Sequence, residues 1–335
     1  FFYAFTPAAQ SDALRYHLAA PQEWLKAGGL VYLPWNAFSN FPSTVEMLFL
    51  YGLGLGGDLL ATGFHFLFLP LTTVAVGLLT REILNEAGFD SESPRFLGIR
   101  APLLAAAAWG SVPMTIGLAG WAFIDLAILF FTLGVIYFQL RWLRSGRRMD
   151  WVLSGLFGGL LVASKYTGVL TVIWAAALFL LAGLSGLLKT SANEACPSES
   201  SGNRSNGPRF GLGRAVSRAI LFGLLAAALG APWWIKNVVH TGNPVYPMAW
   251  SLFGQGGEWT QTCDDLYKEK LQEKGMGHSL GAFLALPWNV TVHLHQFEDH
   301  VLGPFYWVLT LWIGGTALWA LGHARRRPVA ACGAL

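Results

Sequence analysis

The stretch LAGWAFIDLAILFFTLGVIYFQLRW (residues 118–142) decides the fold class of this chain. Between Leu118 and Gln139 its only charged residue is Asp125. A helix crosses a bilayer with about 20 predominantly apolar residues, and this run is long enough to do so. The stretch therefore predicts a transmembrane helix that carries one carboxylate.

Similar apolar runs recur on both sides of this stretch. Hydrophobic residues make up 54% of the chain and charged residues 12%, whereas a soluble domain carries roughly 25% charged residues. A shorter hydrophobic segment, 44–56, leads through Gly56-Gly57 into the first full run. The pattern predicts an all-α, polytopic transmembrane helical bundle, with full spans at about 59–79, 101–117, 118–142, 151–163, 168–188, 215–234 and 303–321.

The segments between the spans predict how this single membrane domain is organised. Residues 1–42 are expected to form a first extracytoplasmic loop with short interfacial helices, followed by transmembrane helices within 43–188. The stretch 189–213 is rich in Ser, Asn and Gly and is typical of a flexible linker, here cytoplasmic. The order is completed by a transmembrane helix (214–235), an extracytoplasmic loop (236–302) and a last transmembrane helix (303–322).

Lysine and arginine are unevenly divided between the two sides that these spans define. Of the 22, fifteen follow the odd-numbered full spans and seven lie on the other side, and an excess of positive charge marks the cytoplasmic side. The segment around Asp12 and the loop 236–302 are therefore expected together on the extracytoplasmic face. The chain begins at Phe1, and we expect it to be a fragment that lacks at least one amino-terminal span.

Several classes of function have no support in the sequence. A net charge of +3 is too small to indicate nucleic-acid binding. The three cysteines are far apart and have no metal-ligand spacing. There is no glycine-rich phosphate loop and no GxSxG motif. We therefore predict no cofactor, and a divalent metal ion, though conceivable, has no support in these patterns.

The segment around Asp12 lies outside every long apolar run and concentrates groups that handle protons. If residues 12–18 are helical, Asp12, Arg15 and Tyr16 share one face at i, i+3, i+4 spacing. A carboxylate near apolar surface can act as a general base, which makes Asp12 the candidate catalytic residue; alternatively it only caps a helix. Arg15, Tyr16 and His17 are candidates for binding a sugar or phosphate, although Tyr16 and His17 also suit packing.

Two further candidate substrate-binding sites lie before and after the first spans. Asn36 and Asn40 stand in an aromatic stretch that suits stacking on a sugar, or equally an aromatic belt at the lipid headgroups. Lys165-Tyr166 occupies an outer turn, where the lysine can bind a lipid phosphate as a compact charge. Alternatively, Lys165 pairs structurally with Asp125 or extends to the interface.

The last candidate pair is Lys236-Asn237, which follows the run 215–234. Directly above the membrane, these side chains would bind the phosphate and the leaving oxygen of a lipid-linked donor. The alternative is a plain turn, because Gly242-Asn-Pro is a strong turn signal.

These segments together resemble bacterial family-39-like glycosyltransferases of the GT-C superfamily, which also contains protein O-mannosyltransferases and aminoarabinose transferases. The similarity runs from Asp12 to about Trp288 and is specific for the superfamily but not for a substrate. The segments that carry it are Asp12 to Pro21, Asn36 to Pro42, Glu46-Met-Leu-Phe, Gly57-Asp58, His65-Phe, Phe123-Ile-Asp-Leu, Lys165-Tyr-Thr, Pro232 to Asn237 and Gly242-Asn-Pro-Val-Tyr-Pro.

The resemblance implies an enzyme of the bacterial plasma (inner) membrane that takes a sugar from a polyprenyl-phosphate donor at the extracytoplasmic face, with inversion. In such enzymes an aspartate of the first outward loop acts as base, and Asp12 matches its position. Lys165 and Lys236 would hold the donor phosphate. The acceptor would be a lipid, a glycan or a protein, and no nucleic acid is involved. Many relatives carry an acidic pair in this loop, whereas Ser11 and Ala13 flank Asp12 here.

Two other functions fit the same scaffold. A polytopic transporter or lipid flippase without transferase activity would carry ionisable groups near the bilayer midplane and internal repeats with broken helices. Asp125 is the only deep candidate in the sequence, and no repeat is visible. A non-catalytic assembly subunit would tolerate Asp12→Asn, whereas an enzyme would lose turnover.

Overall fold

The structure, a computed structural model, describes residues 6–86, 100–195, 212–253, 256–273, 275–277, 279–293 and 296. Within these residues the chain is helical and contains no strand. The bundle consists of α2 (Thr44–Phe66), α3 (Phe68–Glu86), α4 (Ala101–Gly110), α5 (Pro113–Ala119), α6 (Asp125–Ser145), α7 (Arg148–Val162), α8 (Gly168–Ala195) and α9 (Leu212–Thr241). Short helices surround one end and one side, namely a π-helix (Ala13–His17), α1 (Ala19–Ala27), a 3₁₀-helix (Ala37–Asn40), α10 (Trp250–Phe253), α11 (Gln261–Glu273), α12 (Leu280–Leu284) and α13 (Leu286–Val292).

The long helices are consistent with an integral membrane protein. By length and composition, three helical stretches of the described chain can cross a membrane, namely Thr44–Asn85, α6 and α9, or four if the bent pair α4 and α5 forms one span. The angle between α4 and α5 is 63°. These account for part of the predicted spans; the described helix α7 and the apolar part of α8 (Gly168–Leu181) are shorter. The predicted last helix, 303–322, lies outside the described residues.

Helix α2 is broken at Gly56-Gly57, the point at which the sequence passes from the shorter hydrophobic segment into the first full run. Gly57 has φ 76°, a left-handed conformation that favours glycine. The two halves of α2 then approach so closely that a Cβ at Gly52 would lie 2.5 Å from Ala61 Cα. The first half of α2 therefore stays at one end of the bundle, and the second half continues toward α3.

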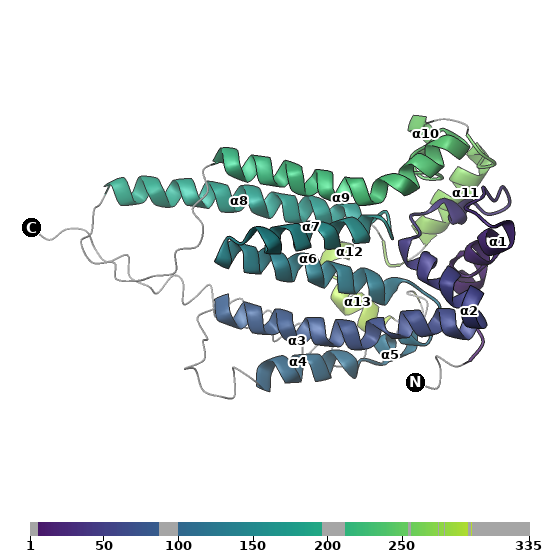
Figure 1. Ribbon diagram of the computed structural model, residues 1–335, viewed down its shortest axis with the longest axis horizontal. Helices are drawn as coiled ribbons and strands as arrows, with labels where there is room; N and C mark the ends of the chain where they lie inside the picture. Colours follow the sequence, from purple (N-terminus) through teal and green to yellow (C-terminus); the bar gives the residue numbers. More distant parts are fainter. Residues whose placement is uncertain are drawn as a thin grey trace, which may run out of the picture.

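The long helices pack side by side along the longest dimension of the molecule (Figure 1). Helix α6 contacts α3 on one side and α7 on the other, and α9 packs on α7 and α8. Small residues allow this packing, since a Cβ at Gly159 of α7 would lie 2.8 Å from Leu229 Cβ of α9. One core joins the π-helix, α2 and α6 through buried residues that include Ala13, Phe49 and Leu126.

The short helices α1, α10 and α11 gather at one end of the bundle, where α9 ends and the α7–α8 connection lies (Figure 1). The α6–α7 connection, with the basic residues Arg144 and Arg148, lies at the opposite end. The structure thus places the Asp12 segment and the chain directly after α9, through α11, at the same end, whereas α12 and α13 of the predicted loop 236–302 lie beside the middle of the bundle (Figure 1). We call this shared end the functional end; its extracytoplasmic location stays a prediction.

Several predicted boundaries differ from the observed ones: the span 59–79 is divided between α2 and α3, the span 101–117 between α4 and α5, and the limits of α6, α8 and α9 also change. Helix α6 begins at Asp125 rather than at residue 118, because residues 120–124 are not helical. Helix α8 continues to Ala195, into the expected linker. Helix α9 continues to Thr241 and includes Pro232, since a membrane helix can tolerate an internal proline. Lys236 and Asn237 are therefore helical residues and not the start of a loop.

Candidate functional site

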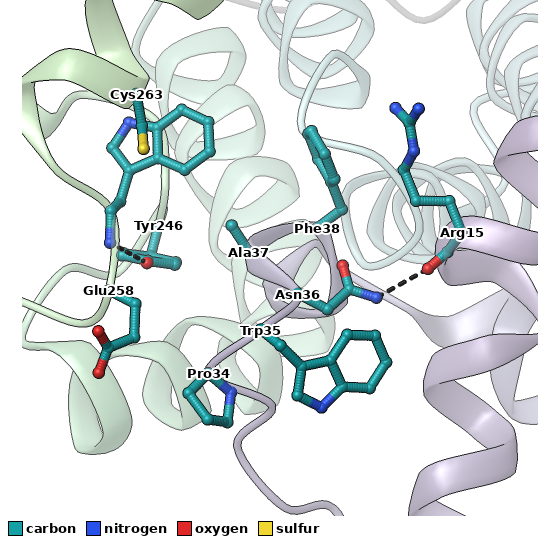
Figure 2. A pocket seen from close by; sticks show the side chains of 10 residues that line it. Arg15, Pro34, Trp35, Asn36, Ala37, Phe38, Tyr246, Glu258 and Cys263 are labelled. Atoms are coloured by element: carbon teal, nitrogen blue, oxygen red, sulfur yellow. Dashed lines mark hydrogen bonds between the residues drawn. The ribbon is translucent and has the colours of Figure 1, made fainter.

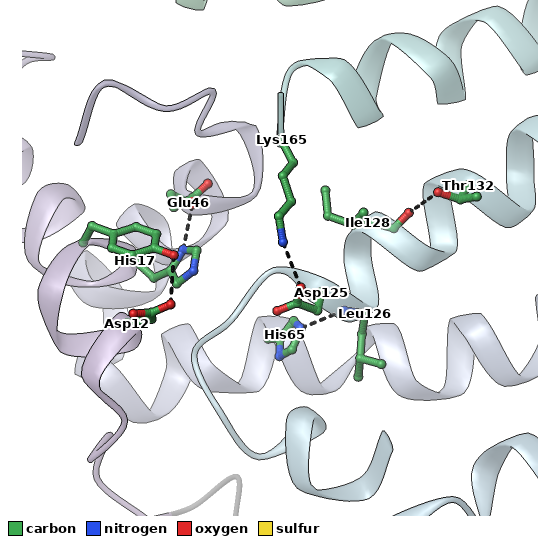
Figure 3. Close-up of polar contacts among 10 residues, drawn as sticks. Asp12, His17, Glu46, His65, Asp125, Leu126, Ile128, Thr132 and Lys165 are labelled. Atoms are coloured by element: carbon green, nitrogen blue, oxygen red, sulfur yellow. Dashed lines mark hydrogen bonds and ion pairs between the residues drawn. The ribbon is translucent and has the colours of Figure 1, made fainter. Parts of the chain in front are cut away.

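A cavity of about 2080 Å³ opens at the functional end, and we call it the large cavity. The π-helix, the first turn of α2, the α5–α6 and α7–α8 connections and α11 all contribute to its lining. Figure 3 shows the polar groups on its near walls. Its ionisable lining residues are Asp12, Arg15, Tyr16, His17, Glu46, Asp125, Lys165, Tyr166, Cys263, Tyr267, Glu269, Lys270 and Glu273.

Asp12 immediately precedes the π-helix, but its side chain makes no capping bond to the backbone. Instead, the Tyr16 hydroxyl donates a hydrogen bond to Asp12 Oδ2 at 3.2 Å (Figure 3). Burial, followed by the negative charge of Asp12, raises the pKa of Tyr16, so the hydroxyl stays protonated as a donor. Asp12, Arg15 and Tyr16 all line the large cavity, although the segment after Asp12 is a π-helix and not the α-helix on which their predicted common face depends.

His17 is buried and pairs with Glu46 from the first turn of α2. His17 Nδ1 lies 2.8 Å from Glu46 Oε1, and both side chains are 5% exposed. With an ionised Glu46, Nδ1–H donates this hydrogen bond, which fixes the orientation of the imidazole ring. Sequence reasoning did not assign Glu46 to the site, although a lone carboxylate in an apolar segment was a usable signal.

Asp125 and Lys165 face each other across one wall of the large cavity. Lys165 Nζ lies 3.1 Å from Asp125 Oδ1, and their side chains are 42% and 41% exposed. The structural pairing with Asp125 is thus present, and Lys165 nevertheless remains on the cavity wall. His65 of α2 holds this region, because its Nδ1–H donates to Trp121 O at 2.7 Å and its Nε2 accepts from Leu126 N–H at 3.3 Å.

Arg15 is exposed and projects from the π-helix at the edge of the large cavity. Among the described residues its guanidinium has no carboxylate partner within ion-pair distance. Arg15 therefore offers an uncompensated positive charge to a bound anion, whereas the charge of Lys165 is already shared with Asp125.

The predicted residues Asn40, Tyr166, Lys236 and Asn237 form a buried polar cluster behind the cavity wall. Asn237 Nδ2 donates to Asn40 O at 2.8 Å and to the Tyr166 hydroxyl at 2.9 Å. Asn40 Nδ2 donates to Ala37 O at 3.3 Å. These bonds tie α9 to the 3₁₀-helix and to the α7–α8 connection. Of the four, only Tyr166 is also a lining residue of the large cavity.

Lys236 departs most clearly from its predicted place. Its Nζ donates to Ser39 O at 2.9 Å and lies 5.2 Å from the ring centre of Trp24 and 5.6 Å from that of Trp233. Lys236 and Asn237 thus support the packing of the functional end, and neither lines the large cavity. The structure does not bring them to Asp12 and Lys165.

Asn36 lines a second hollow of about 410 Å³, which we call the side cavity (Figure 2). Its Nδ2 donates to Arg15 O at 2.8 Å and so joins the 3₁₀-helix region to the π-helix. The side cavity shares Arg15, Phe38, Trp259 and Cys263 with the large cavity. Asn36 is therefore next to the predicted site but on a separate wall.

The part of the chain that the structure describes contains no group of three His, Cys, Asp or Glu residues that could hold a metal ion. No known protein family, curated protein or solved structure matches the chain. The resemblance to family-39-like glycosyltransferases therefore depends on the quoted residues alone. The geometry of the large cavity is the independent basis for a function.

Proposed function

We propose that this protein is a membrane glycosyltransferase that moves a sugar from a polyprenyl-phosphate donor to an acceptor, with Asp12 as the base. The observation that carries this proposal is the meeting of Asp12, Arg15 and Lys165 on one cavity at the end of an apolar bundle. The apolar tail of such a donor must remain in contact with the bilayer, and its phosphate needs a positively charged side chain beside it. A base on the same wall supplies the remaining element of group transfer.

The reaction is a single displacement at the anomeric carbon of the donor sugar. The acceptor hydroxyl or amine loses its proton to Asp12 while its oxygen or nitrogen forms a bond to that carbon. The bond between the carbon and the phosphate oxygen breaks, and polyprenyl phosphate leaves with the electron pair. The configuration inverts because attack and departure occur on opposite faces.

The described side chains have separate tasks in this step. Tyr16 donates to Asp12 Oδ2 and so orients the carboxylate with its other oxygen free for the acceptor proton. Arg15 binds the phosphate through its planar donors. Lys165 adds a second positive charge. Its ammonium group would interact with the bound phosphate and with Asp125 at the same time. Electrostatic stabilisation of the leaving phosphate is thus provided at the cavity wall.

The position of Asp125 also bears on the transporter alternative. A transporter is expected to bind its substrate near the bilayer midplane, at broken helices. Asp125, the deepest candidate in the sequence, is the first residue of α6 and lines the same large cavity as Asp12 (Figure 3). This location favours chemistry at a membrane surface.

The test is sugar transfer from a panel of radiolabelled polyprenyl-phosphate sugars by membranes that contain the full-length protein. Asp12→Asn is expected to lower transfer by about 10²–10⁴-fold, the usual contribution of a general base, at matched expression. Glu23→Gln serves as a carboxylate control, because Glu23 belongs to a surface pair with Lys26. Equal transfer by Asp12→Asn and wild type would remove Asp12 from the mechanism, and no transfer from any donor would contradict the proposed function.

A further inference from the structure

The side cavity is built only from segments outside the candidate transmembrane helices. Its lining residues are Arg15, Pro34, Trp35, Asn36, Ala37, Phe38, Tyr246, Glu258, Trp259 and Cys263. Its volume of about 410 Å³ falls within the range of about 300–1,000 Å³ that small-molecule sites occupy. The mechanism proposed above uses none of this space except the edge at Arg15.

Aromatic side chains make up much of the wall of the side cavity. Trp35 is 64% exposed, and Phe38 and Trp259 are lining residues as well. The C–H groups on the faces of a pyranose ring are apolar, and an aromatic face packs against them while the ring hydroxyls remain at the edge. An exposed tryptophan inside a pocket therefore suits a sugar ring.

The segment that carries Trp35 is held in place on both sides. Asn36 Nδ2 donates to Arg15 O at 2.8 Å, and Ser39 Oγ donates to Asn36 O at 2.7 Å. Opposite this segment, the Tyr246 hydroxyl accepts from Trp259 N–H at 2.9 Å (Figure 2). Both walls are thus fixed by hydrogen bonds, and a fixed wall lowers the entropy cost of binding a ligand.

Two buried polar atoms in this wall have no hydrogen-bond partner among the described residues. They are Asn36 Oδ1, on a residue that is 4% exposed, and Trp259 Nε1. An unsatisfied buried polar atom destabilises the folded state unless a ligand or water bonds to it. Asn36 Oδ1 is an acceptor and Trp259 Nε1 is a donor. The hydroxyl groups of a sugar can both donate and accept, so they could bond to either atom. Arg15 and Glu258 add a charged donor and a charged acceptor to the lining.

We propose that the side cavity binds a pyranose ring of the acceptor, so that the acceptor is a glycan rather than an unglycosylated lipid or protein. The assignment to the acceptor rests on the proposed function; the binding of a sugar ring does not. The lipid tail of the donor must stay in the bilayer, but no residue of a candidate membrane-spanning helix lines the side cavity. The side cavity therefore suits the acceptor better than the donor. A ring held there reaches the large cavity through their shared edge at Arg15, three residues from Asp12.

Cys263 provides a direct measure of occupancy, because it lines both cavities and is partly exposed. The hydrogen bond from the Thr260 hydroxyl lowers the pKa of its thiol, which favours alkylation. The experiment uses the detergent-solubilised full chain with Cys196→Ser and Cys332→Ser, and it measures the rate at which N-ethylmaleimide modifies Cys263. Glucose, mannose, galactose, N-acetylglucosamine and their disaccharides are the probes, and sorbitol is the acyclic control.

At least one of these sugars is expected to slow the alkylation of Cys263 by threefold or more, in a saturable manner, while sorbitol leaves the rate unchanged. Trp35→Ala should require at least tenfold more sugar for the same protection. Trp288→Ala should keep the protection, because this exposed tryptophan of α13 lines neither cavity. Absence of protection by every sugar, or full protection in Trp35→Ala, would overturn the sugar site.

Two further arms separate this inference from the proposed function. Protection that occurs only with a sugar carried on polyprenyl phosphate, equally in wild type and Trp35→Ala, would assign the ring to the donor and overturn the acceptor site. Transfer to a sugar-free peptide or lipid would overturn the glycan acceptor and leave the transferase standing. Protection by free sugars without transfer from any donor would support the sugar site and contradict the transferase.

Discussion

The wall of the large cavity and the buried polar cluster behind it contain similar residues but use them differently. Lys165 and Lys236 illustrate the contrast. Lys165 has a 42% exposed side chain beside Asp125 on the cavity wall. Lys236 donates to a backbone carbonyl and lies over two tryptophan rings. Residue type and position at a helix end were therefore not enough to identify a binding residue.

The two regions differ in the partners to which their polar side chains form hydrogen bonds. In the buried polar cluster, side-chain donors bond to backbone carbonyls and to one another, as buried polar groups require. On the cavity wall, Arg15 has no ion-pair partner within the described chain, and Asp12 has one bond, from Tyr16. Charged groups with unused bonding capacity on a cavity wall are available to a substrate. The donors of Asn40, Lys236 and Asn237 bond to the fold instead, and their two unpartnered amide oxygens, Asn40 Oδ1 and Asn237 Oδ1, are buried away from the large cavity.

The largest stability effect is expected in the buried polar cluster. Asn237→Ala removes the donor to Asn40 O, the Tyr166 hydroxyl and Pro244 O and leaves buried acceptors with fewer partners. We expect a loss of about 2–4 kcal/mol in the free energy of unfolding. Thermal unfolding in detergent should show a melting temperature lower by on the order of 5–10 °C.

Asn289→Ala in α13 is the matched control and should melt close to wild type. A variant Asn237→Ala that melts like wild type but no longer binds polyprenyl phosphate would reverse the assignment. It would move Asn237 from the buried polar cluster to the binding site.

The second effect concerns binding at the cavity wall. Arg15→Ala removes the uncompensated guanidinium, and hydrogen bonds to charged groups contribute about 1.5–3 kcal/mol. The dissociation constant for polyprenyl phosphate is therefore expected to rise by about 10–100-fold, with little change in melting temperature without ligand. Ligand-induced thermal shifts of the full chain measure both quantities. Lys26→Ala, in a surface pair on α1, should bind like wild type, and unchanged binding by Arg15→Ala would contradict the phosphate role.

Much of the arrangement followed from local patterns in the sequence. The apolar runs predicted an all-helical membrane protein, and the hydrophobic pattern is divided at Gly56-Gly57, where α2 is broken. Each of these depends on a short stretch of chain. The span count also placed the Asp12 segment and the chain directly after α9 at one end, since short connections reverse the chain direction each time, but it did not predict that α12 and α13 lie beside the bundle.

One error concerned the end of a helix. Helix α9 continues through Pro232 and ends near Gly242, whose φ of 72° suits glycine, so the turn signal was correct but the helix end was placed too early.

Other features were missed because they depend on contacts between distant residues. The pairing of His17 with Glu46 joins the π-helix to α2, and no local pattern indicates it. The unsatisfied atoms of Asn36 and Trp259 likewise depend on the folding of two separate segments.

The smallest effects are expected from the two lysines, and together they give the sharpest test of the contrast. Lys165→Met breaks a partly exposed ion pair, which contributes about 0–1 kcal/mol, so the melting temperature should change little. The dissociation constant for polyprenyl phosphate should rise several-fold, because a positive charge leaves the cavity wall.

Lys236→Met should give the opposite result. It removes the hydrogen bond to Ser39 O and the contacts with Trp24 and Trp233, which together contribute about 1–2 kcal/mol, while methionine refills most of the volume. The melting temperature should therefore fall. The dissociation constant for polyprenyl phosphate should stay within about twofold of wild type, whereas a loss of about 1.4 kcal/mol in binding free energy would raise it about tenfold. If both variants weakened binding equally, both lysines would contact the phosphate, and the distinction between cavity wall and buried polar cluster would be wrong at Lys236.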